Sequence, residues 1–157
     1  DAAISGAIYV GGVIELTATT IVSHPEVYRD LASADLKTWL DAERTFVALC
    51  FATPPDAVTF QRLVANAAVA SPVLQTAVPK MTVAARDGLG GMTKPLLLIY
   101  GAHDALVHAL PSITRAKELN PQLQSIVYPG AGHAPFVEEA ERFNRDVMDF
   151  VKAAQRR

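Results

Sequence analysis

The sequence contains very little cysteine. Cys50 is the one cysteine among 157 residues, so an internal disulfide framework is excluded. A zinc site built on several thiolates is excluded for the same reason. Because a chain without disulfides suits a reducing compartment, we expect a cytoplasmic protein.

A strong excess of charge of one sign is also missing. Lys and Arg number 14 against 16 Asp and Glu, for a formal net charge of -2, and no run of basic residues occurs. Nucleic acids and anionic membrane surfaces are bound through clusters of Lys and Arg. We therefore predict neither nucleic acid nor a membrane among the partners of this chain.

Long apolar runs are missing too, although 50% of the residues are hydrophobic and 19% are charged. The apolar stretches are shorter than the roughly 20 residues that span a bilayer, and no basic segment precedes one as in a signal peptide. This composition predicts a folded domain with a sizeable core. The sequence starts with Asp1 and not with Met, so we expect that polypeptide preceded it.

Three short apolar segments have the pattern of buried strands in a parallel sheet. Residues 4–16 (ISGAIYVGGVIEL) are apolar at both alternating positions, and Gly11 and Gly12 are expected to end this strand. PLLLIYGAHD, from Pro95, is a continuous apolar run, and LQSIVYPGAGH, from Leu123, leads into a glycine-rich turn. The first segment is expected to be buried on both faces of the sheet, and the second is also expected to be a buried strand.

Helical patterns fill the intervening segments. Between about residues 22 and 89 the pieces HPEVYRDLA and DLKTWLDAERTFVALCFA precede two or three short helices broken by Pro72 and Pro79. PSITRAKELNP, with Pro111 near its first position, predicts a crossover helix. The order strand, helical block, strand, helix, strand, helix predicts an α/β fold with a parallel sheet of about three strands.

The segment PFVEEAERFNRDVMDFVKAAQ is predicted to close the chain as one amphipathic helix. Its apolar stripe is expected to contain Phe136, Val137, Phe143, Val147, Phe150 and Val151. Its first turns hold the acidic residues Glu138, Glu139 and Glu141. Negative charge at this position favours the helix dipole, and we assign these carboxylates no functional role.

Two polar side chains follow neighbouring strands at their carboxyl ends. Asp104 follows the second strand, and His133 follows the third. Ligands of open α/β sheets bind at this edge, where a carboxylate can orient an imidazole. We predict that His133 is a general base oriented by Asp104, although each residue alone could also serve a turn or a helix cap. The glycine-rich turn, with Gly130 and Gly132, is expected to take backbone angles that other residues resist.

These motifs resemble the α/β-hydrolase fold superfamily. The family's seventh strand ends in a Gly-x-x-Asp that carries the triad acid, which resembles KPLLLIYGAHD. Its eighth strand leads into a Gly-x-Gly-His that carries the triad base, which resembles GAGHAPFVEEAERFNRDVMDFV. Its sixth strand resembles GAIYVGG. The resemblance implies a core strand in residues 1–20, a helical cap in 21–90 and a C-terminal core in 91–157. Asp104 and His133 are then the triad acid and base.

The nucleophile of that family is missing from the sequence. Members carry it on a Gly-x-Ser-x-Gly elbow, and no serine of this chain has that glycine frame. In family order the elbow precedes Asp1. The resemblance implies a missing N-terminal half that supplies the nucleophile and the oxyanion hole, either as the other product of a cleavage or as a separate piece. A stand-alone domain that has lost catalysis is the third possibility.

The resemblance implies hydrolysis of small apolar esters through a Ser-His-Asp triad, with no cofactor. Other chemistries of the same fold remain open: haloalkane dehalogenase, epoxide hydrolase, carbon–carbon hydrolase and perhydrolase. A non-catalytic ligand-binding protein is a rival from another class. The nucleophile, which distinguishes these chemistries, is the part that the sequence does not contain.

Four other titratable side chains have competing interpretations. Glu15 follows the first strand, where haloalkane dehalogenases place their acid, and is an alternative to Asp104. His103 and His108 could suggest a metal site with Asp104, but no further ligands cluster with them, so we predict none. His24 precedes a proline at a helix start, where we expect a cap or a surface residue, although it could also face the pocket.

Aromatic residues lie on the apolar faces of the expected cap. Trp39, Phe46 and Phe51 are predicted to line an apolar pocket for an acyl or alkyl group. Cys50 and Phe60 lie on the same faces. Most of these side chains are expected to belong to the core of the cap, with one or two facing a small-molecule substrate.

Overall fold

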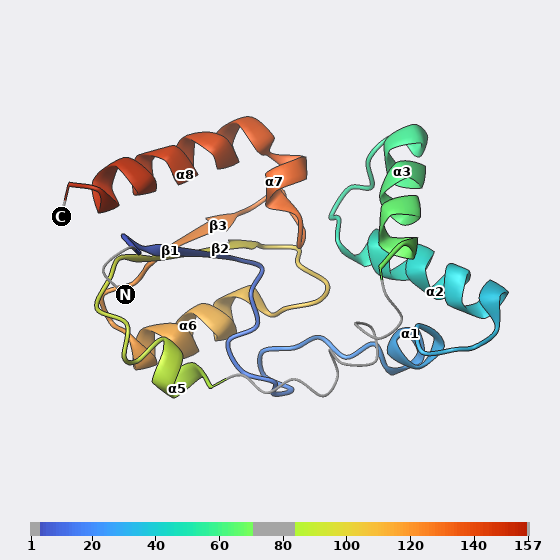
Figure 1. The fold of residues 1–157 in the computed structure, drawn as a ribbon, viewed down its shortest axis with the longest axis horizontal. Helices are drawn as coiled ribbons and strands as arrows, with labels where there is room; N and C mark the ends of the chain where they lie inside the picture. The colour runs from blue at the N-terminus through green and yellow to red at the C-terminus, as the bar shows by residue number, and fades with distance from the viewer. Residues whose placement is uncertain (1–3, 71–83, 157) are drawn as a thin grey trace.

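The computed structural model describes residues 4–70 and 84–156. Its core has three layers, with a sheet between two helices (Figure 1). Helix α6 (Ala109–Leu119) covers one face of the sheet, and helix α8 (Ala140–Ala154) covers the other. This is the α/β arrangement that the order of the segments predicted.

The sheet is parallel and has three strands. They are β1 (Ala7–Val10), β2 (Leu96–Gly101) and β3 (Gln124–Tyr128), in the spatial order β1-β2-β3. Val10 pairs with Ile99, so β1 and β2 end close to each other. The carboxyl ends of all three strands therefore lie at one edge of the sheet, as the prediction required.

Strand β2 holds the two layers of the core together. All six of its residues are buried, and their side chains alternate between the faces. Leu98 and Tyr100 pack in the cluster that contains the buried side chains of α6. Leu97 and Ile99 pack on the other face with Phe150 of α8. The continuous apolar run that predicted this strand reflects burial on both faces.

Strand β1 is less buried than predicted. All four of its residues are only half-buried, because β1 lies at the edge of the sheet, with β2 on one side. Among the described residues no strand pairs with its other side. The strand ends before Gly11 and Gly12, as expected.

Three helices form a cap to one side of the sheet (Figure 1). They are α1 (Pro25–Asp30), α2 (Leu36–Leu49) and α3 (Ala57–Ala68), and α2 contacts both of the others. The side chains of Asp35 and Asp56 accept hydrogen bonds from backbone N–H groups in the first turns of α2 and α3. The helical block of the sequence therefore forms a group of helices beside the sheet (Figure 1), and two of them have defined starts.

The last described part of the expected cap range of 21–90, residues 84–90, packs with the core that contains the sheet. Helix α5 (Ala85–Gly88) contacts α6, and Leu89 belongs to the main core cluster. Pro72 and Pro79, the expected helix breakers, lie outside the described residues. Across the described ranges, no helix is both long and apolar enough to cross a membrane.

The closing segment was predicted to form one helix, but it forms two. Helix α7 (Pro135–Glu138) is separated from α8 by Glu139, whose φ of -127° and ψ of 48° are not helical. This break takes Phe136 and Val137 off the stripe that packs on the sheet, and both side chains are exposed. Hydrophobic periodicity runs across the break and does not reveal it.

Candidate active site

Asp104 lies in the loop that follows β2, with its side chain only 1% exposed. Its Oδ1 accepts hydrogen bonds from the backbone N–H groups of Leu106 at 2.8 Å and Val107 at 2.9 Å. These two bonds fix the orientation of the carboxylate. Oδ2 is thereby directed toward the loop that follows β3.

His133 meets Asp104 at that point. Its Nδ1 lies 2.9 Å from Asp104 Oδ2, and its side chain is 29% exposed. A carboxylate can only accept hydrogen bonds, so we assign the imidazole proton to Nδ1. Nε2 is then available to accept a proton, as a general base requires. The structure thus brings together the two residues that the sequence predicted as base and acid.

Glu15, the alternative acid, lies elsewhere. Its Oε1 accepts a hydrogen bond from Nε of Arg115 at 2.7 Å, in a half-buried ion pair. Arg115 belongs to α6, which packs below the sheet. The carboxylate that contacts His133 is therefore that of Asp104.

The remaining histidines do not form a metal centre with Asp104. His103 and His108 are both exposed. In the two described ranges no three His, Cys, Asp or Glu side chains lie close enough together to hold a metal ion. His24 makes no side-chain cap to α1, and its Nε2 instead lies 2.7 Å from the carbonyl oxygen of Ala105.

The acid loop is held by the segment that enters the cap. Val22 N donates to the carbonyl of Leu106 at 3.0 Å, and His108 N donates to the carbonyl of Thr20 at 2.9 Å. An antiparallel bridge between Ile21 and its partner in the acid loop lies between these two bonds. The position of Asp104 therefore depends on the first residues of the cap as well as on β2.

The ring of His133 lies against the end of β1. Gly11 there has a φ of 56°, and a Cβ at this position would lie 2.7 Å from Cε1 and 2.8 Å from Nδ1 of the ring. Gly130 and Gly132, expected to take unusual angles, have no positive φ. The left-handed glycine of the site therefore directly follows β1 and does not lie in the histidine turn, which corrects the prediction.

Gly132 is required for a different reason, the close approach of two backbones. A Cβ there would lie 2.6 Å from the backbone N of Ala52 and 2.9 Å from the backbone C of Phe51. Next to it, Ala134 N donates to the carbonyl of Cys50 at 3.0 Å. The histidine turn is thus packed directly on the loop between α2 and α3, which we call the cap loop (residues 50–53).

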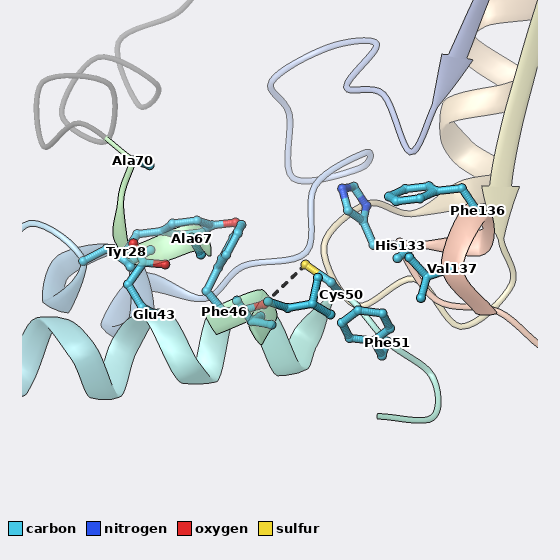
Figure 2. A pocket seen from close by; sticks show the side chains of 14 residues that line it. Tyr28, Glu43, Phe46, Cys50, Phe51, Ala67, Ala70, His133, Phe136 and Val137 are labelled. Carbon is cyan, nitrogen blue, oxygen red and sulfur yellow. Dashed lines mark hydrogen bonds between the residues drawn. The ribbon is translucent and has the colours of Figure 1, made fainter. Parts of the chain in front are cut away.

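A cavity of about 430 Å³ lies between the cap and the histidine turn (Figure 2). Its walls are mostly apolar, with Tyr28 and Phe46 on the cap side and His133 and Phe136 on the core side. The lining residues are Tyr28, Leu31, Glu43, Phe46, Val47, Cys50, Phe51, Leu63, Ala67, Ala70, His133, Ala134, Phe136 and Val137. The catalytic base predicted from the sequence is therefore part of the wall of an apolar pocket.

Two of the three predicted pocket residues line this cavity. Phe46 and Phe51 do so, whereas Trp39, also half-buried on α2, is not among the described lining residues. Sequence reasoning missed Phe136, which was assigned to the core stripe, and Glu43, a buried carboxyl group on α2. The helical period of α2 could have indicated Glu43, which lies on the same face as Phe46 and Val47.

The thiol of Cys50 is held in its neutral form. Burial and, to a smaller extent, the negative charge of Asp104 together raise its pKa to about 11. Burial also raises the pKa of the Tyr28 hydroxyl across the same cavity. A thiol with so high a pKa is protonated near neutral pH, so Cys50 is not suited to act as the nucleophile of this site.

Comparison with known proteins agrees with this geometry. The sequence model of the Alpha/beta hydrolase family matches residues 2–146. A structure from Burkholderia cenocepacia, provisionally described as an aryl esterase, is 60% identical with a TM-score of 0.95, over 98% of this chain and 57% of its own. The esterase RhEst1 of Rhodococcus sp. ECU1013 shares the fold with a TM-score of 0.85 at 23% identity, over 97% of this chain and 57% of its own.

Among curated proteins, the match covers a shorter segment. Pimeloyl-acyl-carrier-protein methyl ester esterase of Yersinia enterocolitica is 39% identical over 67 residues, which are 43% of this chain and 26% of that protein. The chain therefore spans just over half the length of its structural neighbours and about a quarter of this relative. With the family match over residues 2–146 and an Asp-His pair at the carboxyl edge of a parallel sheet, the chain belongs to the alpha/beta hydrolase family.

Proposed function

We propose that this chain supplies the base and the acid of a Ser-His-Asp triad that hydrolyses small esters with an apolar acyl or aryl group. One observation carries the proposal: the hydrogen-bonded pair of His133 and Asp104 at the wall of an apolar cavity of about 430 Å³. A pocket of this kind binds the apolar part of a ligand and leaves its reactive group at the polar side chains.

In the proposed reaction, Nε2 of His133 takes the proton of a serine hydroxyl as the serine oxygen attacks the ester carbonyl. The resulting imidazolium is stabilised by Asp104 and gives its proton to the leaving alcohol. A water molecule then loses a proton to the same nitrogen and attacks the acyl-enzyme, which releases the carboxylic acid. The serine regains its proton, and no cofactor takes part.

Ester hydrolysis is favoured over other chemistries of the fold by the relatives of higher identity. The Burkholderia protein, at 60% identity, is provisionally described as an aryl esterase, and the Yersinia protein, at 39%, acts on a methyl ester. Tyr28, Phe46 and Phe51 around the cavity suit an aryl group or a short acyl chain. Dehalogenation, epoxide opening and carbon–carbon cleavage require other nucleophiles or substrates, for which the site offers no specific support.

We further propose that the nucleophile and the oxyanion hole come from an N-terminal half on a companion chain. The sequence has no Gly-x-Ser-x-Gly elbow, and the chain spans 57% of its structural neighbours. We call the two parts together the assembled enzyme. In the laboratory the segment of the Burkholderia protein that this chain does not cover can serve as the N-terminal part.

Replacement of His133 tests the proposal. In the assembled enzyme, His133→Ala should lower kcat for phenyl acetate or p-nitrophenyl butyrate by about a thousandfold or more, because the serine loses its base. His103→Ala, an exposed histidine in the neighbouring loop, is the control and should leave kcat unchanged. Turnover that survives in His133→Ala, or a lack of turnover in the wild-type assembly, would contradict the proposed function.

A further inference from the structure

The carboxylate of Glu138 joins two loops that are far apart in the sequence. Its Oε2 accepts a hydrogen bond from the backbone N–H of Gly132 at 2.7 Å. Its Oε1 accepts hydrogen bonds from the backbone N–H groups of Ala52 at 2.9 Å and Thr53 at 3.1 Å. One side chain thus binds the residue before His133 and two residues of the cap loop.

These three N–H groups lie where secondary structure gives them no other partner. Ala52 and Thr53 follow the end of α2, and Gly132 follows the turn after β3. A carboxylate that accepts three N–H bonds forms charge-assisted bonds, which are shorter and stronger than bonds between neutral groups. The helix dipole does not account for this geometry, because α7 is a single short turn.

The histidine turn has little room to move while these bonds are present. Gly132 is packed on the backbone of Phe51 and Ala52, and Ala134 N donates to the carbonyl of Cys50 at 3.0 Å. His133 stands between these two anchored residues. The cap loop and the catalytic base are therefore held as one unit, with Glu138 as the side chain that links them.

We propose that Glu138 is a positioning residue for His133, which holds the catalytic turn against the cap loop so that the imidazole keeps its distance to Asp104 and its place at the cavity. The inference rests on the proposed function insofar as His133 is the base. A base displaced by about 1 Å can lose up to about a hundredfold in rate. Cap position and catalysis are thereby coupled through one carboxylate.

Two variants test this inference. Glu138→Gln keeps the shape of the side chain, but its NH2 group must face an N–H donor on one side, so one of the two loops is released. Glu138→Asp keeps the charge but is one methylene shorter and cannot reach both loops. The matched control is Glu141→Gln, which removes the same charge from an exposed position at the start of α8.

The first readout is amide hydrogen exchange on the 157-residue chain, which requires no activity. In Glu138→Gln, peptides that contain Ala52, Thr53 and Gly132 should exchange at least about tenfold faster, whereas peptides from β2 and α8 should not change. The second readout is kinetic, on the assembled enzyme. There kcat should fall by about 10-fold to 100-fold while KM changes by less than about twofold, because Glu138 itself does not line the cavity.

Several results would overturn the inference. Unchanged exchange at these amides in both variants, an unchanged kcat, or an equal loss in Glu141→Gln would show that Glu138 does not position the base. If exchange rises throughout the chain and Tm falls, Glu138 stabilises the whole fold and does not specifically position the base. If His133→Ala retains turnover, the proposed function fails, and the exchange measurement still decides whether Glu138 joins the two loops.

Discussion

Asp104 uses its two carboxylate oxygens for different purposes. Oδ1 accepts from the N–H groups of Leu106 and Val107, while Oδ2 accepts from Nδ1 of His133. The first pair of bonds fixes the carboxylate, and the third bond fixes the ring. The tautomer that leaves Nε2 free to accept a proton is therefore a consequence of the fold of the loop that follows β2.

Asp104→Asn should keep the bonds to the two backbone N–H groups and lose the bond that fixes the ring of His133. The single amide oxygen is required by the two backbone N–H groups, so the NH2 group must face Nδ1 of His133. The ring then carries its proton on Nε2 and cannot act as a base. We expect kcat of the assembled enzyme to fall by about a thousandfold or more with little change in Tm.

Glu15→Gln is the control for Asp104→Asn, because Glu15 pairs with Arg115 and does not contact the histidine. It should change kcat by less than about twofold. A loss of activity in Glu15→Gln as large as in Asp104→Asn would reverse the assignment of the acid.

Gly11 shows how a backbone position limits the base. Its φ of 56° is in the left-handed region, and a Cβ would lie 2.7 Å from the ring of His133. Gly11→Ala should therefore destabilise the fold by about 1–2 kcal/mol through its backbone. The methyl group should also displace the imidazole and lower kcat by about tenfold or more.

Urea unfolding and steady-state kinetics would measure the two effects of Gly11→Ala. The control is Gly88→Ala in α5, where a Cβ would meet nothing within 4 Å and the helix should favour alanine. Wild-type stability and activity in Gly11→Ala would mean that β1 and the ring are not held together in this way.

At the scale of elements, local pattern was enough to predict the strands and to place Asp104 next to His133. A continuous apolar run marks β2 because this strand is central, and the polar residue that follows it must lie at the sheet edge. Asp104 and His133 follow neighbouring parallel strands, so topology brings them together without knowledge of any side-chain contact. The family resemblance rests on these same short segments.

Contacts between distant segments could not be predicted. Glu138 is 86 residues from Ala52, and nothing in its local sequence distinguishes it from Glu141. The break at Glu139 is equally hidden, because the apolar spacing continues across it and α7 is too short to show a period. Phe136 was therefore assigned to the core stripe, whereas it lines the cavity.

At the scale of the whole molecule, the sheet is open on the side of β1. The strand is half-buried and pairs only with β2 among the described residues, while Ile8 and Val10 pack on the cluster under α8. An apolar edge strand favours association with another strand. The structural neighbours extend beyond this chain, which covers 57% of the Burkholderia protein. This edge is therefore where we expect the rest of the fold to pair.

The companion half should bind at β1 and stabilise the chain. We expect that co-expression with the segment of the Burkholderia protein that this chain does not cover yields a complex in which exchange of the β1 amides slows. At a free concentration about 100 times Kd, binding contributes about 3 kcal/mol to the stability of the chain, which a rise in Tm would report. Native mass spectrometry should find the 16.8 kDa chain together with the second polypeptide. If the chain remains alone, with unchanged exchange at β1 and full esterase turnover, the companion is not needed and the nucleophile must be sought within these 157 residues.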